Sequence, residues 1–235
     1  MFNATPSVSR VELAPGSRVT VIDDVLSDPH ALVDLAVRHR TAFTRATTNA
    51  FPGLELPLPQ TVLDRFAEHF SQHARAAIGA RRVLSASGRL SLVTLPPAAL
   101  GALQRVCHRD RLAARADQCV GAAVVYLFRD EQLGGTSFFR SRHDVAATET
   151  LIRRWSTTDA QTFTAETGWP AGYMLSSNQH FEHVARIDAR WNRMVCYDGS
   201  LFHGSHIERP ELLSDDPSRG RLTLNLFYVC RRSAA

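Results

Sequence analysis

The sequence contains no lysine, so all 27 of its basic residues are arginines, against 23 acidic residues. Every side chain that carries a fixed positive charge is therefore a guanidinium, a group that can grip a carboxylate through two parallel hydrogen bonds. The arginines are scattered along the chain, and their longest runs are pairs such as Arg81-Arg82. Although the net charge is +4, the sequence has no basic stripe interleaved with aromatic residues, and we expect no nucleic-acid partner.

Cysteine and long apolar runs are also scarce. The four cysteines show no C-x-x-C spacing, and no charged and apolar leader opens the sequence. The best apolar run, residues 122–128, is far shorter than the roughly 18 residues that a membrane span requires. The sequence thus predicts a protein of a reduced cytoplasm that is not a membrane protein.

The composition is that of an ordinary globular protein. Of the 235 residues, 44% are hydrophobic and 21% are charged, which excludes a disordered chain and a disulfide-stapled miniprotein. At roughly 150 residues per domain, and because β-rich domains often reach this length, we expect one domain over residues 1–235.

The pattern of apolar residues changes near residue 84. Before it, residues 19–22 predict a strand, and residues 31–40 and 60–78 have the spacing of amphipathic helices. After it, short apolar or alternating runs predict strands at 90–95, 122–128, 136–139, 193–197 and 222–229. Residues 148–155 predict a short helix, and residues 156–172 predict a polar, irregular and mobile segment. The fold class is therefore mainly β with flanking helices (α+β), with a helical layer over residues 1–83.

Ten histidines invite a search for metal-ligand spacing, and His108-Arg109-Asp110 is the best candidate. In an extended chain, residues two apart project from the same face, so this imidazole and carboxylate can reach one ion together. Two histidines and one carboxylate form a facial triad that leaves positions open for small molecules. The candidates for the third ligand are His143, His180, His183, His203 and His206.

His203 is the best placed of these candidates, because it follows the strand 193–197 through the turn Asp198-Gly199-Ser200. His206 is assigned to the surroundings of the site or to the surface. The pair His180-x-x-His183 lacks further ligands at zinc-finger spacing. An H-x-D tripeptide alone also occurs by chance, and a histidine at the surface is the alternative interpretation.

The order of the elements carries more information than the tripeptide. After His108-x-Asp110 come the buried run 122–128, the turn and strand 134–139, the segment 192–203 that ends in His203, and Arg221-Leu-Thr-Leu-Asn225. This order resembles the double-stranded β-helix (jelly-roll) oxygenases that depend on Fe(II) and 2-oxoglutarate, most closely the prolyl 4-hydroxylase-like branch. The resemblance covers residues 90–230.

The resemblance implies roles for individual residues. His108 and Asp110 match the proximal metal ligands, and His203 matches the distal histidine. Arg221, 18 residues after His203, matches the basic residue that pairs with the far carboxylate of 2-oxoglutarate. The alternation of side chains along a strand is consistent with this role, because Arg221, Thr223 and Asn225 share one face of the last strand. The Thr223 hydroxyl can therefore assist the Arg221 guanidinium in binding a carboxylate. Tyr126 is a weaker candidate for contacting the cosubstrate, and a buried core tyrosine is the alternative.

The sequence departs from the pattern upstream of the metal motif. Several relatives have an aromatic residue there, whereas this chain has Gln104-Arg-Val-Cys107. The resemblance further implies a jelly-roll core over 84–232, packed on the N-terminal helices, with an insert at about 140–191 that acts as a lid.

The implied activity is that of a 2-oxoglutarate- and Fe(II)-dependent dioxygenase that uses O2 to hydroxylate a small molecule, an amino acid or a peptide. The presence of Asp110 favours hydroxylation over halogenation, because the related halogenases lack this carboxylate. Two alternatives remain open: a non-catalytic metal-binding or sensor module, and a cupin-type metal enzyme that does not use 2-oxoglutarate. The sequence indicates neither the substrate nor the oligomeric state.

Overall fold

The computed structural model describes residues 1–235 except 15, 46–49, 111–114 and 234–235. Its helices are α1 (His30–Arg38), α2 (Gln60–His73), α3 (Val145–Trp155) and α4 (Ala160–Thr167). Its strands are β1 (Ser7–Ala14), β2 (Ser17–Asp23), β3 (Gly53–Pro57), β4 (Ala80–Val93), β5 (Gln118–Tyr126), β6 (Thr136–Ser141), β7 (Phe181–Ile187), β8 (Met194–Asp198), β9 (Phe202–Ser205) and β10 (Arg221–Arg232).

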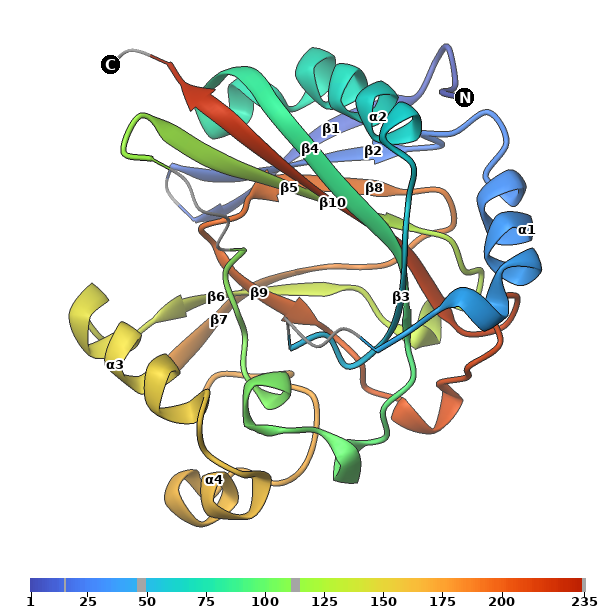
Figure 1. The fold of residues 1–235 in the computed structure, drawn as a ribbon. Coiled ribbons are helices and arrows are strands. Elements are labelled where there is room, and N and C mark those ends of the chain that lie inside the picture. Colours follow the sequence, from blue (N-terminus) through green and yellow to red (C-terminus); the bar gives the residue numbers. More distant parts are fainter. Residues whose placement is uncertain (15, 46–49, 111–114, 234–235) are drawn as a thin grey trace.

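These strands form two antiparallel sheets. The large sheet has the order β1-β2-β8-β5-β10-β4-β3, and the small sheet has the order β7-β6-β9. An isolated antiparallel bridge between His108 and His203 adds the segment around His108 to the small sheet, beside β9. Figure 1 shows the small sheet below the large one, with both chain termini at the far side of the large sheet.

The path of the chain between the sheets is that of a double-stranded β-helix. From β4 onward the chain visits the large sheet, the small sheet at His108, the large sheet at β5, and the small sheet at β6 and β7. It then returns to the large sheet at β8, crosses to β9 and ends in the large sheet at β10. Four neighbouring strands of the large sheet, β4-β10-β5-β8, thus face the small sheet, whose row is the segment at His108 followed by β9, β6 and β7. The predicted jelly-roll of a mainly β fold is confirmed.

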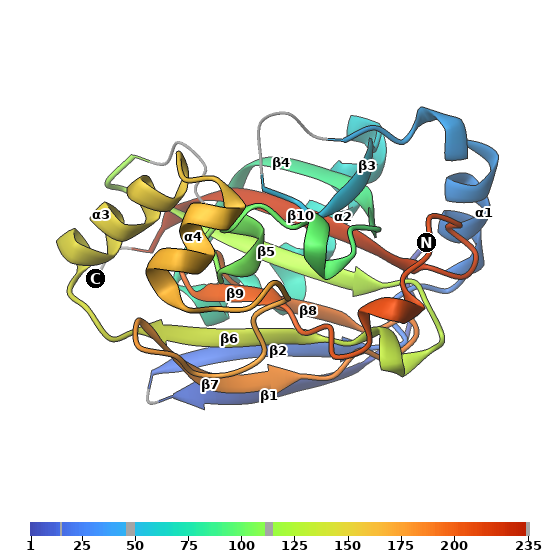
Figure 2. The ribbon, with the colours of Figure 1, turned by 90° about the horizontal axis from the view of Figure 1, so that it is seen from below.

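Three apolar clusters divide the molecule into layers. The first lies between the large sheet and helices α1 and α2, and contains residues such as Phe66, Phe70, Leu224 and Tyr228. The second fills the space between the sheets, and the third packs α3 and α4 on the small sheet. Figure 2 shows α3 and α4 at one end of the sheets, with α1 at the other end.

The last strand separates the layers by simple alternation. Leu222, Leu224, Leu226 and Tyr228 are fully buried in the cluster beneath α2. The residues between them, Arg221, Thr223, Asn225 and Phe227, line a cavity between the sheets. Because successive side chains of a strand point to opposite faces, an apolar face and a polar face coexist along one segment.

The structure corrects three expectations. Residues 1–83 are not only a helical layer, because β1, β2 and β3 belong to the large sheet. Residues 156–172 are not irregular, because they include α4, which buries Phe163 completely. The expected lid at 140–191 also supplies β7, a structural strand of the small sheet.

Gly134 makes a close turn before β6. Its φ of +82° lies in the left-handed region, and a Cβ atom there would come within 1.7 Å of the His206 carbonyl oxygen. Glycine is therefore required where the chain enters the small sheet beside β9.

Among the described helices, none is long and apolar enough to cross a membrane. All four cysteines are buried and free.

Candidate metal and cosubstrate site

The backbone brings the three sequence-predicted ligands to one place. The amide of His108 donates to the His203 carbonyl over 2.9 Å, and the amide of His203 donates to the His108 carbonyl over 2.8 Å. Two residues later, the amide of Asp110 donates to the Gly199 carbonyl over 2.8 Å. The H-x-D segment is thus tied at both ends to the turn and strand that carry the distal histidine.

The side chains of these residues converge. One ligand atom from each of His108, Asp110 and His203 lies within 4.8 Å of the others. Nε2 of His108 is 3.9 Å from Oδ1 of Asp110, and Nε2 of His203 is 3.5 Å from Oδ2. Two atoms that bind one ion at about 2.0–2.2 Å each lie at most about 4.4 Å apart, so both of these His–Asp separations are short enough for a shared ion.

Hydrogen bonding and burial prepare His203 for metal binding. Its Nδ1 lies 2.9 Å from the Leu201 carbonyl oxygen, which can only accept, so Nδ1 carries the proton and Nε2 presents its lone pair. Burial lowers the pKa of His203 to about 4, which keeps the ring neutral at physiological pH. A neutral imidazole with a free Nε2 is the form that coordinates a metal.

Asp110 supplies the clearest sign that a cation belongs here. Its Oδ2 is buried and has no hydrogen-bond partner among the described residues. Burial raises the pKa of Asp110, and the positive charges of His108 and Arg89 oppose that shift. An unpaired buried carboxylate oxygen is costly, and a metal ion between the three side chains would satisfy it. The donor set of two imidazoles and one carboxylate fits a first-row metal such as Fe(II).

The three side chains open into a cavity of about 650 Å³ between the two sheets. Its wall also includes Arg221 and Thr223 from β10, Thr136 from β6 and Arg89 from β4. This volume is typical of sites for small molecules and cofactors. A second hollow of about 690 Å³ between α2 and β4 contains none of the predicted site residues.

Arg221 lies at the start of β10 and is only 3% exposed. Its Nε donates to the Leu133 carbonyl over 3.0 Å, and its Nη2 donates to the Gly135 carbonyl over 2.8 Å. In the part of the chain that the structure describes, no carboxylate forms an ion pair with Arg221. A guanidinium has five N–H groups, so three of them remain beyond these two bonds. A buried cation without an anion on the wall of a cavity is suited to receive an anionic ligand.

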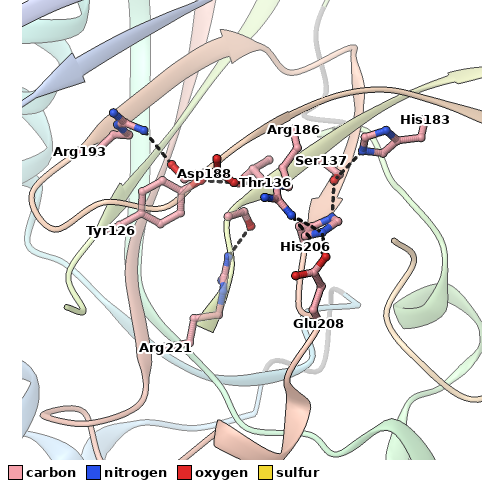
Figure 3. A network of polar contacts seen from close by, with 11 residues as sticks. Tyr126, Thr136, Ser137, His183, Arg186, Asp188, Arg193, His206, Glu208 and Arg221 are labelled. Atoms are coloured by element: carbon pink, nitrogen blue, oxygen red, sulfur yellow. Dashed lines mark hydrogen bonds and ion pairs between the residues drawn. The ribbon is translucent and has the colours of Figure 1, made fainter. Parts of the chain in front are cut away.

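The two weaker cosubstrate candidates occupy different positions. Thr223 lines the cavity, and its hydroxyl donates to the Ser91 carbonyl over 3.4 Å. Tyr126 is fully buried in the apolar cluster between the sheets, and its hydroxyl lies 2.8 Å from Oγ1 of Thr136. Figure 3 shows Tyr126 directed at Thr136, with Arg221 close by. Tyr126 therefore stands behind a threonine that lines the cavity.

The remaining histidine candidates belong to other clusters. His206 and His183 both contact Oγ of Ser137, at 2.8 and 3.0 Å, and Figure 3 shows this group apart from Arg221. His206 also contacts Glu208, with Nε2 3.1 Å from Oε1. His180 pairs instead with His143, at 2.8 Å between ring nitrogens. None of these four joins His108 and Asp110.

The structure adds cavity residues that the sequence did not single out. Arg89 on β4 is paired with Glu55, Arg109 is paired with Glu149 of α3, and Tyr173 donates its hydroxyl to the Leu95 carbonyl over 2.7 Å. All three line the cavity. The period-two spacing already placed Asn225 on the same strand face as Arg221 and Thr223, and Asn225 does line the cavity, but no local pattern indicates Arg89.

A family model described as a family of unknown function (DUF6445) matches residues 4–228. No curated protein matches the chain.

Several solved structures are similar in fold. SnoN, a non-haem α-ketoglutarate-dependent epimerase from nogalamycin biosynthesis, is 13% identical, with 93% of this chain and 82% of that chain covered and a TM-score of 0.49. HygX from Streptomyces hygroscopicus, solved with nickel and 2-oxoglutarate bound, is 13% identical over 92% and 84%, with a TM-score of 0.47. A prolyl hydroxylase from Trichoplax adhaerens, in complex with a peptide fragment of hypoxia inducible factor, is 10% identical over 89% and 82%, with a TM-score of 0.47.

Proposed function

The chain belongs to DUF6445, a family of unknown function, and we propose that this member is an Fe(II)- and 2-oxoglutarate-dependent oxygenase. One observation carries the proposal. The three potential ligands His108, Asp110 and His203 converge on the wall of the cavity that also holds Arg221, a buried guanidinium with no ion-pair partner among the described residues. A metal site and an anion site in one cavity are what a chelating dicarboxylate cosubstrate requires.

In this proposal His108, Asp110 and His203 hold the iron and leave its other coordination positions open to small molecules. When bound there, iron would supply the activation of O2, coupled to oxidative decarboxylation of 2-oxoglutarate to succinate and CO2. The protein contributes a neutral imidazole at His203, fixed by its bond to the Leu201 carbonyl, and a carboxylate at Asp110. The same carboxylate favours hydroxylation of the substrate.

Arg221 would bind the carboxylate of 2-oxoglutarate that lies farther from the iron. Its bonds to the Leu133 and Gly135 carbonyls fix the plane of the guanidinium before the ligand arrives. A preoriented cation loses little conformational freedom on binding, which strengthens the interaction. Thr223, two residues along the same strand face, would add a hydroxyl to the same pocket.

The insert that follows β6 would complete the substrate pocket. Ile152 of α3 and the residues Tyr173 and Met174 after α4 line the cavity opposite the large sheet. We assign to them the exclusion of water and the shaping of the pocket, with a small molecule as the substrate because the cavity measures about 650 Å³.

The test is succinate formation from 2-oxoglutarate with added Fe(II), in the presence and absence of O2. We expect succinate only when Fe(II) and O2 are both present, and we expect Asp110→Ala to abolish both succinate formation and stoichiometric binding of Fe(II). Asp34→Ala is a matched control, because this aspartate is exposed on α1 and does not line the cavity. Binding of Fe(II) without 2-oxoglutarate turnover would favour the sensor or cupin-type alternatives. Equal succinate formation by Asp110→Ala would refute the proposal.

A further inference from the structure

A second guanidinium lies on the cavity wall, away from Arg221. Arg89 of β4 is the direct cross-strand partner of Asn225 of β10, and both side chains line the cavity. Asn225 is four residues beyond Arg221, which corresponds to about 13 Å along the strand at roughly 3.3 Å per residue. The two cations therefore stand at separate levels of the same cavity.

Arg89 is held in a fixed orientation. Its Nε donates to Oε1 of Glu55 over 2.5 Å, and its guanidinium carbon lies 4.7 Å from the ring centroid of Phe227. Glu55 belongs to β3, on the side of β4 away from β10, and is not part of the cavity wall. The negative partner thus sits behind Arg89, and the positive end of the pair faces the cavity.

The surroundings of Arg89 suit a carboxylate. With Nε engaged by Glu55, the two terminal nitrogens of the guanidinium form the edge that can grip a planar anion through parallel hydrogen bonds. The neighbouring Asn225 amide offers a further donor.

The rest of the cavity wall is largely apolar. Its apolar side chains include Phe51, Leu103, Val106, Ile152, Met174 and Phe227. A ligand that fills this space needs a hydrocarbon body, and a charged group on it needs a fixed counter-charge. 2-Oxoglutarate would use one carboxylate at the metal and its other carboxylate at Arg221. Two more guanidiniums line the cavity: Arg109 uses its terminal Nη2 for Glu149, whereas Arg89 contacts Glu55 through Nε. Arg89 is therefore the better placed of the two to bind a ligand carboxylate through its terminal nitrogens.

We propose that Arg89 and Asn225 form a second carboxylate-binding subsite, which receives the carboxylate of a small substrate with an apolar or aromatic body. This inference rests on the proposed function, in that it assigns Arg221 to the cosubstrate and Arg89 to the substrate. It names the substrate class as monocarboxylic acids whose hydrocarbon part lies against Phe227 and the apolar wall.

Binding measurements test the subsite without catalysis. Isothermal titration of the protein with 3-phenylpropionate, 4-phenylbutyrate and octanoate, each paired with its neutral amide, measures whether the carboxylate matters. We expect at least one acid to bind about tenfold or more tightly than its amide, and Arg89→Gln to remove that difference. Arg89→Lys should retain part of it, which separates loss of the charge from loss of the fold.

Competition identifies which arginine holds the probe. Repeating the titration with 2-oxoglutarate present should leave the affinity for the acid nearly unchanged, and Arg221→Gln should do the same. If 2-oxoglutarate displaces the carboxylic acid, or if Arg221→Gln no longer binds the acid, then the acid is held by Arg221 and the inference is overturned. Equal affinities of every acid and its amide, or no binding by any acid at millimolar concentration, would also overturn it.

The affinity of Arg89→Gln for 2-oxoglutarate shows whether Arg89 binds the cosubstrate instead of the substrate. If this variant weakens 2-oxoglutarate binding as strongly as Arg221→Gln does, Arg89 serves the cosubstrate and the inference fails. None of these measurements needs iron, oxygen or turnover. An inactive protein in the succinate assay would therefore refute the proposed function while leaving the carboxylate subsite standing.

Discussion

At the scale of single residues, Arg221 is the proposed binding partner of the 2-oxoglutarate carboxylate that lies farther from the metal. It is buried, its plane is fixed by two backbone carbonyls, and no acidic side chain among the described residues pairs with it. Arg221→Leu should raise the 2-oxoglutarate concentration needed for half-maximal succinate formation by roughly tenfold or more, because the dicarboxylate loses its counter-charge. Arg219→Leu, two residues away and exposed, is the matched control and should behave like the wild type.

Arg221→Leu also removes two hydrogen bonds to Leu133 and Gly135, so its melting temperature should be measured beside its activity. A folded Arg221→Leu protein with an unchanged requirement for 2-oxoglutarate would contradict the assignment of this anchor. Binding of Fe(II) should change little in the variant, because Arg221 is not one of the converging ligands.

The sequence can indicate residues whose relation is local. The spacing of His108 and Asp110, and the parity of Arg221 and Thr223, depend only on the period of two in an extended chain. Arg89 could not be predicted in this way, because its place opposite Asn225 depends on the register between β4 and β10, strands that lie far apart in the sequence. The hydrogen bond of Tyr126 to Thr136 likewise depends on how β5 and β6 face each other.

At the scale of elements, Arg109 connects the metal-ligand segment to its neighbours. Its guanidinium carbon lies 4.6 Å from the ring centroid of Phe202, the residue before His203, and its Nη2 is paired with Glu149 of α3. Glu149→Gln should weaken binding of Ni²⁺ by about tenfold, because residues that orient metal ligands typically contribute 10- to 100-fold to affinity. The control is Glu166→Gln, which disrupts the more exposed pair between Arg154 of α3 and Glu166 of α4. Equal Ni²⁺ affinities in both variants would show that Arg109 plays no positioning role.

Helix α4 shows why some elements escape prediction. Its sequence, Ala160–Thr167, is mostly polar, with Phe163 as its only large apolar residue, so it has no amphipathic stripe. Asp159 caps the helix by accepting from the amides of Gln161 and Thr162, and Phe163 packs against Trp155 and Trp169. These tertiary contacts stabilise a helix that its own periodicity does not indicate.

Phe163→Ala should lower the free energy of unfolding by about 3–5 kcal/mol, as expected when a fully buried aromatic side chain leaves a cavity. Urea denaturation measures this change, with Thr157→Ala in the exposed turn before α4 as a control expected to stay within about 0.5 kcal/mol. A small effect of Phe163→Ala would mean that α4 is not packed as a part of the core.

At the scale of the whole molecule, a partly buried, two-pronged ion pair between Asp23 and Arg193 joins the N-terminal strands to the jelly-roll. Asp23, at the end of β2, accepts from Nε of Arg193 over 2.6 Å and from Nη2 over 3.0 Å, and both side chains are 19% exposed. The hydrogen bonds from Arg193 lower the pKa of Asp23. Residues 1–83 were expected to pack as helices on the core, but β2 also pairs directly with β8.

Because the folded protein lowers the pKa of Asp23, this pair stabilises the fold above the unfolded pKa of about 3.9, and the contribution is lost as the pH falls through the folded value. Asp23→Asn should therefore cost about 1.5–3 kcal/mol at pH 7 in urea denaturation, and the difference from the wild type should shrink from pH 5 towards pH 3. Asp215→Asn, which breaks the exposed pair with Arg40, should cost less than about 1 kcal/mol at either pH. A pH-independent difference for Asp23→Asn would contradict the role of this ion pair.

The most direct test of the proposed oxygenase is a crystal structure of the protein grown without oxygen in the presence of Fe(II) and 2-oxoglutarate. We predict one iron ion within about 2.0–2.3 Å of His108, Asp110 and Nε2 of His203, located by its anomalous scattering. We also predict that one carboxylate of 2-oxoglutarate lies at the iron and the other is hydrogen-bonded to Arg221. Iron bound elsewhere, or 2-oxoglutarate bound away from Arg221 in a fully loaded crystal, would contradict the assignment.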